Sequence, residues 1–330
     1  MTKVALVDEY GAYLHIKDGR FRLKVGDSIK WDAAPVELDS IVFVVDGASL
    51  SASSVELAAE FGIDLVFLKG TKPVARLVPA KYGSTMRTWQ DQLVWSSDEG
   101  RCAALASLFI SGKIHNQRMV LYEYAQKARA AGKRSPPLDQ AVEQLASLQG
   151  GLSLCQRVQE VLNVEAHAAN VYWRGVANLL PSELGFQHRL TKQRLAEGAV
   201  PDPFNIALNI GYSILRKEVW RAVFLAGLNP YLGFLHRPRA GRMSLVLDLM
   251  EEFRPHCVDR PLIALARQKP DVILRLGKGG LEEGRKEVWR AVLERMKERE
   301  DMVSLIVHQA RLLAQHLRGT GTYKPFKSRW

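Results

Sequence analysis

The pattern of apolar and polar positions divides the chain near residue 85. Before this point, apolar residues alternate with polar ones at the two-residue period of a half-buried β-strand. Residues 13–17 and 20–25 form two such segments, and Asp18 and Gly19 between them are typical of a tight hairpin turn. The first part of the chain therefore predicts paired antiparallel strands.

Further strand-length apolar runs follow the hairpin, at residues 41–45, 63–68 and 74–78. Between the first two of these runs, Ser51 or Ser53 is suited to cap a short helix that ends at Gly62. No glycine-rich phosphate loop and no cluster of catalytic residue types is found here. Residues 1–85 are therefore expected to form a small β-rich domain with one helix, in a structural or dimer-forming role.

After residue 85 the apolar residues recur with a period near 3.6, which indicates amphipathic helices. Clusters of Pro and Gly, such as Pro136-Pro137, separate the periodic segments. The expected helices cover about residues 88–130, 138–149, 152–179, 204–226, 244–252, 282–299 and 301–317. The predicted fold class is α+β, with a small N-terminal β-rich domain joined to a larger all-α C-terminal domain at residues 86–330.

Length and composition narrow the class of protein. A chain of 330 residues is long enough for two domains with substantial cores. It has no apolar run long enough to span a membrane, and its first residues lack the order of a secretory signal, so a soluble cytoplasmic protein is expected. Cys102, Cys155 and Cys257 form no CxxC pair, which predicts reduced thiols rather than a zinc site or a disulfide framework.

The net charge of +11 is unevenly distributed. Residues 1–85 contain 10 Lys and Arg against 11 Asp and Glu, whereas residues 86–330 contain 36 against 24, a net charge of +12. This asymmetry indicates that the helical domain faces a polyanion, for which nucleic acid is the commonest candidate. A basic surface that only maintains solubility is the alternative.

The most informative stretch is 227–255, in which a basic loop with His236 precedes a helix with three carboxylates. Asp248 and Glu251 share one face of this helix, because residues three apart are neighbours on a helix surface. Such carboxylates repel one another unless they are protonated, paired with basic groups or bridged by a cation. The stretch is therefore either a solvated acidic face beside a loop histidine or half of a divalent-metal site.

Glu165 is the candidate for a further ligand, within the apolar helical run VLNVEAHAANVYW. A carboxylate on a mostly buried helix needs a partner, since an unpaired buried charge is costly. That partner is either one of the many arginines or a metal shared with His236 and Glu251. His167 lies about 200° from Glu165 around the helix, and therefore is not expected to share its metal.

Several motifs together identify a family. They are VEAHAANVYW around Glu165, DPFNIALNIGYSIL from Asp202, AGLNPYLGFLH ending at His236, SLVLDLMEEFRP from Ser244, and the closing YKPFKSRW. In these motifs, almost from end to end, the chain resembles the CRISPR-associated spacer-acquisition integrases, the Cas-one family. The N-terminal SLSASSVELAAEFGIDLVFLKGTKPVARLVP also resembles the β-domain of that family.

The resemblance implies a set of site residues. Glu165, His236 and Glu251 occupy the positions of the metal-binding triad of the family, whose third place is Glu in some members and Asp in others. The implied metal is a single Mn²⁺ or Mg²⁺. Asp248 occupies a further acidic position one turn earlier and is expected in a supporting role. Ala166 replaces a glycine that is common in the family, a change that adds one methyl group to a helix.

The resemblance also implies an activity and partners. The expected protein is a metal-dependent DNA integrase and endonuclease of CRISPR adaptation, which joins the 3′-OH ends of short DNA fragments to the CRISPR repeat by transesterification. Its expected partners are double-stranded DNA, a second copy of the chain in a homodimer, and the small Cas-two protein. Arg237, Arg239 and Arg242 are expected to bind DNA phosphates beside the metal, and an ordinary basic surface loop is the alternative.

Two other functions remain open from the sequence. One is a metal-dependent nuclease of branched or damaged DNA, in which water replaces the 3′-OH at the same triad. The other is a non-catalytic, basic DNA-binding scaffold, which the three ligand-type residues at matching positions disfavour. The segment 323–330 mixes aromatic and basic residues, and the sequence leaves open whether it packs on its own helical domain, a partner or DNA.

Overall fold

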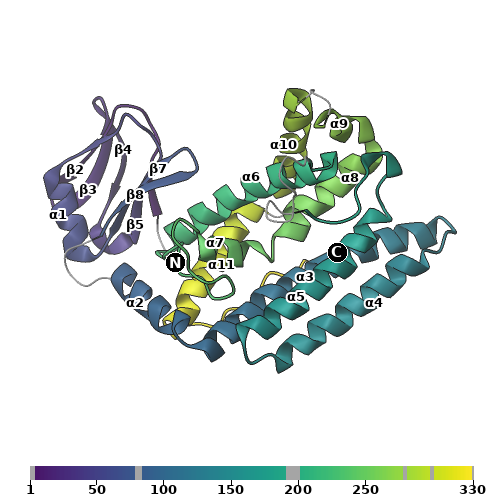
Figure 1. Cartoon of the computed structure of the whole chain (residues 1–330). Helices are drawn as coiled ribbons and strands as arrows, with labels where there is room; N and C mark the ends of the chain where they lie inside the picture. The colour runs from purple at the N-terminus through teal and green to yellow at the C-terminus, as the bar shows by residue number, and fades with distance from the viewer. Residues whose placement is uncertain (1–3, 79–83, 191–200, 278–280, 298–300, 329–330) are drawn as a thin grey trace.

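The computed structural model describes residues 4–78, 84–190, 201–277, 281–297 and 301–328. A β-rich N-terminal region containing β1 to β8 is followed by a helical C-terminal region, and Figure 1 shows the strands grouped to one side of the helices. The predicted fold class is therefore confirmed. The assignment of residues 1–85 and 86–330 as separate domains stays a prediction.

Within the described residues, the strands form two four-stranded sheets. The first has the order β1-β5-β7-β8, in which β1, β5 and β7 are parallel and β8 is antiparallel. The second has the order β4-β3-β2-β6. The bounds are β1 Val4–Val7, β2 Ala12–Lys17, β3 Arg20–Val25, β4 Ser28–Ala33, β5 Ser40–Phe43, β6 Ser49–Leu50, β7 Asp64–Lys69 and β8 Lys72–Leu77.

Local sequence signals explain the N-terminal elements. Asp18 and Gly19, with φ angles of 53° and 70°, connect β2 to β3, so the predicted hairpin turn is confirmed. Helix α1, Ala52–Phe61, begins after Ser51, whose side chain accepts a hydrogen bond from the backbone N–H of Ser54 at 3.2 Å. It ends at Gly62, which adopts the left-handed conformation expected of a C-terminal cap.

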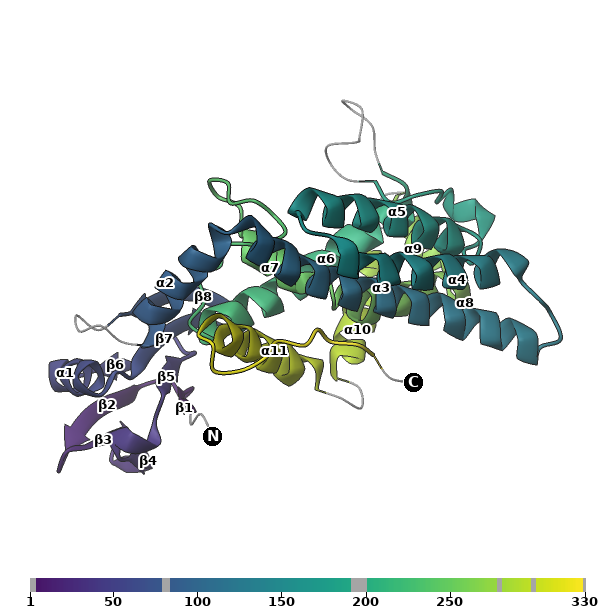
Figure 2. The ribbon, with the colours of Figure 1, turned by 90° about the horizontal axis from the view of Figure 1, so that it is seen from below.

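The C-terminal region is an array of helices of very different lengths (Figures 1 and 2). Helix α3 packs along α4 and α5, and α6 packs against α7, α10 and α11. The bounds are α2 Ser84–Ser96, α3 Glu99–Ala130, α4 Pro136–Gly151, α5 Val158–Ala177, α6 Pro203–Leu225, α7 Ser244–Met250, α8 Arg260–Gln268, α9 Pro270–Arg275, α10 Leu281–Lys297 and α11 Met302–Leu317. Short turns of 3₁₀ helix occur at η1 Pro35–Glu37, η2 Leu152–Leu154 and η3 Ser182–Leu184.

Two expectations about the helices are wrong. The helix predicted over 88–130 is interrupted between α2 and α3, where the Asp98 side chain accepts a hydrogen bond from the Arg101 backbone N–H at 2.9 Å and caps α3. The predicted list also omits α8 and α9, which follow a π-helical turn, η5 Pro255–Asp259. Their prolines lie in the first helical turn, where proline is tolerated.

Arg76 joins the two regions. From β8 it forms an ion pair with Asp64 at 2.9 Å and donates hydrogen bonds to the Thr85 hydroxyl and to the Phe224 carbonyl on α6. Because this guanidinium is buried and bound on three sides, it fixes the first sheet against α6. Among the residues described here, every helix is too short or too polar to span a membrane.

Candidate active site

A polar cleft of about 720 Å³ lies among α3, α5, α6 and the segment that follows α7. Lys113 of α3, Glu165 of α5 and Glu251 line one part of it, and Arg189 and Tyr212 line another. The cleft thus brings together two of the three predicted metal ligands, although each comes from a different part of the chain.

Lys113 connects the two carboxylates. Its Nζ atom lies 2.5 Å from Glu165 Oε1 and 2.7 Å from Glu251 Oε2. Arg254 lies 3.1 Å from Glu251 Oε1. Glu251 Oε2 is buried, and the Lys113 ammonium is the partner that neutralises its charge. In this structure Glu165 therefore pairs with a basic residue, which was the alternative to a metal. The partner is a lysine and not one of the arginines.

The pKa of Glu251 reflects opposing effects. Burial raises this pKa, whereas the charges of Arg254 and Lys113 lower it, and the cations prevail, giving a pKa of about 2. The carboxylate is therefore ionised at neutral pH despite its burial.

Asp248 holds the loop that carries His236. Its Oδ1 accepts hydrogen bonds from the His236 backbone N–H at 2.9 Å and from His236 Nδ1 at 2.7 Å. Its Oδ2 accepts from the backbone N–H groups of Phe234 at 2.6 Å and Leu235 at 3.0 Å. Because an ionised carboxylate only accepts, the ring donates from Nδ1, and in the neutral imidazole this tautomer has its lone pair on Nε2.

Gly233 is required for this arrangement. A Cβ atom at this position would lie 2.8 Å from Asp248 Oδ2 and 2.7 Å from the Ser244 Cβ. Any larger residue would therefore separate the loop from α7. Asp248 is fully buried and holds the His236 loop, and its expected supporting role in the metal site stays a prediction.

The residues present fit a hard divalent cation. Two carboxylates and a neutral imidazole are suitable ligands for Mn²⁺ or Mg²⁺, and an imidazole anchored by a carboxylate through its other nitrogen is a common arrangement at metal sites. The Lys113 ammonium supplies positive charge to both carboxylates. Within the described residues, no three His, Cys, Asp or Glu side chains are grouped closely enough to hold a metal. The triad of Glu165, His236 and Glu251 therefore stays a prediction.

Glu252, the next residue after Glu251, points to the opposite side. Its carboxylate accepts hydrogen bonds from the Tyr323 hydroxyl at 3.0 Å and from the Phe326 backbone N–H at 2.8 Å. Burial raises the pKa of Glu252 to about 8, although both hydrogen bonds act to lower it. Glu252 therefore anchors the C-terminal segment and does not face the cleft.

Arginines form the other wall of the cleft. The guanidinium of Arg189 donates hydrogen bonds only to neutral oxygens: Leu190 O at 2.6 Å, Asn205 Oδ1 at 2.7 Å and Asn209 Oδ1 at 2.6 Å. Arg189 and Arg254 both stack on the ring of Tyr212, at 5.3 and 4.7 Å from its centroid. Among the described residues Arg189 has no carboxylate within ion-pair distance, so its charge is available to an anion in the cleft.

Beneath this wall, Asp259 accepts hydrogen bonds from the hydroxyls of Tyr212 at 2.6 Å and Tyr172 at 3.1 Å. Burial raises the pKa of Asp259 to about 6, although the two tyrosine hydrogen bonds and Arg254 lower it. Asp259 thereby fixes the tyrosine on which both arginines stack.

The loop arginines lie apart from this cleft. Arg237 and Arg239 are exposed, and Arg242 is half-buried. Arg239 and Arg242 line a separate depression of about 310 Å³ together with Arg216 of α6. They remain candidates for DNA binding, at a different place from the arginines of the cleft.

Sequence reasoning missed Lys113, Arg189 and Arg254. Lys113 lies within a long helix and has no neighbouring motif, so no local signal was available. Arg254 was visible in the quoted motif SLVLDLMEEFRP, three residues after Glu251, the spacing of a helical ion pair. Arg189 lies outside every quoted motif.

The fold and the site together define the class of this protein. A β-rich region with two sheets is joined to a helical region, and the helical region holds a cleft lined by carboxylates and guanidinium groups. The family model described as CRISPR associated protein Cas1 matches residues 5–272. The chain therefore belongs to the Cas1 family, and the resemblance of its motifs is confirmed.

Individual relatives agree with this assignment. The chain is 45% identical over 275 residues to CRISPR-associated endonuclease Cas1 1 of Saccharolobus solfataricus, covering 83% of this chain and 74% of the relative. A casposase bound to its integration product has a similar fold, with a TM-score of 0.79, 20% identity and coverage of 100% and 99% of the two chains. A chain of a partial Cas6-RT-Cas1–Cas2 complex matches with a TM-score of 0.69, 18% identity and complete coverage of both chains.

Proposed function

We propose that this protein is a divalent-metal-dependent DNA integrase and endonuclease of CRISPR adaptation, which joins the 3′-OH ends of short DNA fragments to the CRISPR repeat. The observation that carries the proposal is the convergence of Glu165 and Glu251 on a single cation, Lys113, in the cleft of a Cas1 fold. Two carboxylates that both contact one ammonium group form a position that suits a divalent metal ion.

In this proposal Glu165, His236 and Glu251 hold one Mn²⁺ or Mg²⁺. When bound, this metal supplies Lewis-acid activation of a phosphodiester and stabilises the charge that develops on phosphorus. Asp248 keeps the His236 proton on Nδ1, so that Nε2 is free to act as a ligand. Arg254 balances the Glu251 charge from the side opposite Lys113.

The reaction is a transesterification. The 3′-oxygen of the fragment forms a bond to the phosphorus of the repeat while the bond from that phosphorus to the 3′-oxygen of the repeat strand breaks. The hydroxyl proton of the fragment passes to solvent, and the leaving 3′-oxygen takes up a proton and becomes a new 3′-OH. Arg189 is placed to bind a phosphate oxygen, since two of its five N–H donors are not used by the described oxygens. With water as the nucleophile, the same residues would cleave DNA, which is the alternative function on branched or damaged DNA.

We infer partners from the family and from the surface. The chain of the Cas6-RT-Cas1–Cas2 complex shares this fold, which supports a Cas2 partner for the present protein. The β-rich region exposes apolar side chains, including Val36 at 84% and Val74 at 63%. We take these side chains as candidate contacts of a homodimer formed through the proposed domain at residues 1–85.

The test uses a short duplex with free 3′-OH ends, a supercoiled plasmid carrying a repeat, the Cas2 protein and Mn²⁺. The wild-type protein is expected to join the duplex covalently to the plasmid. Glu165→Gln and His236→Ala are each expected to reduce joining at least 100-fold, on the order of the loss seen when one essential catalytic group is removed. His167→Ala on α5 is the matched control, because this histidine is exposed and only two residues from Glu165.

The products decide between the two enzymatic functions. A branched plasmid containing the duplex identifies an integrase, whereas nicked or shortened DNA without joining identifies a nuclease. If Glu165→Gln and His236→Ala joined and cleaved DNA as well as wild type, the proposed site would be wrong.

A further inference from the structure

The C-terminal segment, residues 323–328, packs against the helical region directly behind the candidate metal site. Tyr323 is buried, and its ring lies 5.5 Å from that of Phe109 on α3. The Phe326 ring stacks on Phe253 at a centroid distance of 5.3 Å and an interplanar angle of 11°. The segment is therefore part of the core, so of the roles that the sequence left open, packing on its own helical region is observed.

Glu252 is the point at which this segment meets the site. Two of its hydrogen bonds come from the segment, one from the Tyr323 hydroxyl and one from the Phe326 backbone N–H. Within the described residues, no Lys or Arg forms an ion pair with Glu252, although it is completely buried. The orientation of this side chain thus depends on the segment.

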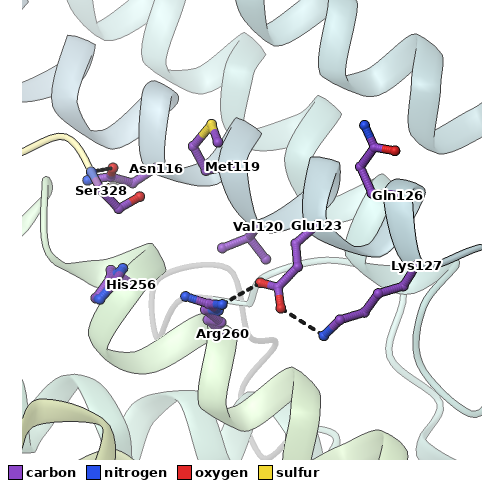
Figure 3. Close-up of a pocket in the computed structure, with 9 residues that line it drawn as sticks. All are labelled: Asn116, Met119, Val120, Glu123, Gln126, Lys127, His256, Arg260 and Ser328. Atoms are coloured by element: carbon purple, nitrogen blue, oxygen red, sulfur yellow. Dashed lines mark hydrogen bonds and ion pairs between the residues drawn. The ribbon is translucent and has the colours of Figure 1, made fainter. Parts of the chain in front are cut away.

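Helix α3 holds the segment from the other side (Figure 3). The buried Asn116 donates from Nδ2 to the carbonyls of Glu252 at 2.7 Å and Phe326 at 3.1 Å. Its Oδ1 accepts from the Ser328 backbone N–H at 2.8 Å, an interaction that Figure 3 shows at the edge of a separate cavity of about 290 Å³. A single side chain therefore binds both the segment and the backbone of Glu252.

Gly112, one turn before Asn116, allows the close approach. A Cβ atom here would lie 3.0 Å from the Cβ atoms of both Glu252 and Pro325, and 3.1 Å from the Phe326 carbonyl oxygen. The next residue, Lys113, contacts Glu165 and Glu251. One turn of α3 thus supports the C-terminal segment and the candidate metal ligands together.

We propose that residues 323–328 are a positioning element of the metal site. By holding Glu252 on the far side of its helical turn, the segment fixes the rotation of that turn and keeps Glu251 facing the cleft. Tyr323 and Glu252 are then positioning residues that act through Glu251 without touching the metal. This inference rests on the proposed function, in that it requires Glu251 to be a metal ligand.

Two substitutions in the full-length protein test the proposal. Tyr323→Phe removes only the hydroxyl that binds Glu252. Gly112→Ala introduces a methyl group that displaces the segment, while alanine itself favours the helix. Each is expected to weaken Mn²⁺ binding about 10-fold in isothermal titration calorimetry, the lower end of the range for residues that orient a metal ligand. The joining reaction is expected to need correspondingly more Mn²⁺ and to recover at saturating Mn²⁺.

Gly150→Ala is the matched control, because this exposed glycine of α4 has nothing within 4 Å of an added Cβ. It is expected to bind Mn²⁺ as wild type does. If Tyr323→Phe and Gly112→Ala lowered the melting temperature but left Mn²⁺ affinity unchanged, the segment would be structural only and the inference would be overturned. If the wild-type protein itself did not bind Mn²⁺, the proposed function would fail, and this inference with it.

Discussion

The carboxylates of Glu251 and Glu252 follow one another in the chain and serve opposite sides of the same helical turn. Glu251 forms ion pairs with Lys113 and Arg254 in the cleft, whereas Glu252 accepts hydrogen bonds from Tyr323 and the Phe326 backbone. Both residues lie in the turn that follows α7, and their side chains have different partners, so one carboxylate cannot replace the other. This division supports the choice of Glu251, and not Glu252, as the predicted ligand.

Lys113→Met is expected to make the stability of the protein depend on a divalent metal. Without the ammonium, Glu165 and Glu251 lose the positive charge that they share, and removing one partner of a buried ion pair costs about 3 kcal/mol. In EDTA, urea unfolding should show this loss. Saturating Mn²⁺ should recover about 2.7 kcal/mol at 100 times the dissociation constant.

Lys127→Met on the same helix provides the comparison for this prediction. Lys127 is also paired with a glutamate, Glu123, at 2.8 Å, but its side chain is largely exposed. Its removal should cost less than about 1 kcal/mol, and Mn²⁺ should not change that cost. Failure of Mn²⁺ to stabilise Lys113→Met would show that the two carboxylates do not bind the metal.

Asp248→Asn is expected to weaken metal binding through His236. An asparagine has one oxygen, so it cannot accept from all four donors that Asp248 now satisfies. The unsatisfied N–H groups should cost about 1–3 kcal/mol of unfolding free energy. Loss of the anchor on Nδ1 should lower Mn²⁺ affinity by about 10- to 100-fold, measured by calorimetry.

Asp301→Asn separates loss of stability from loss of metal binding. Asp301 caps α11 by accepting from the Val303 backbone N–H at 3.1 Å, far in the sequence from the predicted ligands. Weakening this cap should reduce stability by no more than about 1 kcal/mol and leave Mn²⁺ affinity unchanged. Equal metal affinities for Asp248→Asn and wild type would exclude a role for Asp248 in orienting His236.

The fold was predictable where its signals are local. Ser51 and Gly62 mark both ends of α1, and Asp18-Gly19 marks the β2–β3 turn, because capping and turn geometry depend on only a few adjacent residues. The break before α3 and the presence of α8 and α9 were missed. Asp98 lies at the start of α3, and a proline lies in the first turn of α8. Each of these residues can also mark the end of a helix, so its position alone did not show that a new helix begins there.

The candidate site was predictable only in part. Family motifs selected Glu165, His236 and Glu251, but no periodicity indicated that Lys113 lies between two of them. The motifs also favoured Glu251 over Glu252, but nothing in the sequence indicated that Glu252 binds the Tyr323 hydroxyl. Such contacts join residues from distant parts of the chain, and therefore depend on how the helices pack rather than on any local pattern.

Arg189→Gln is expected to weaken DNA binding through the loss of one phosphate contact. The Arg189 guanidinium has no carboxylate partner among the described residues, and it lines the same cleft as Glu165. The slope of log affinity against log salt concentration should become shallower by about 0.9. Measuring this slope by fluorescence anisotropy in EDTA makes the result independent of the metal.

Arg267→Gln is the control for lost arginine contacts. Arg267 also donates to a backbone carbonyl, that of Leu179, and stacks on a tyrosine, Tyr124, but it does not line the cleft. Its substitution should leave the salt slope unchanged. Identical slopes for Arg189→Gln and wild type would place the phosphate contacts elsewhere, with the loop arginines Arg239 and Arg242 as the next candidates.

His256 is expected to make unfolding depend on pH. Burial, together with the charges of Arg295 and Arg260, lowers the pKa of His256 from 6.5 to about 3. Between these values the unfolded chain holds a proton that the folded protein does not, so stability rises with pH, by at most about 1.4 kcal/mol per unit. His256→Gln should flatten the curve of unfolding free energy from about pH 4 to 6. His167→Gln, at an exposed site, should follow wild type, and parallel curves for all three proteins would contradict the prediction.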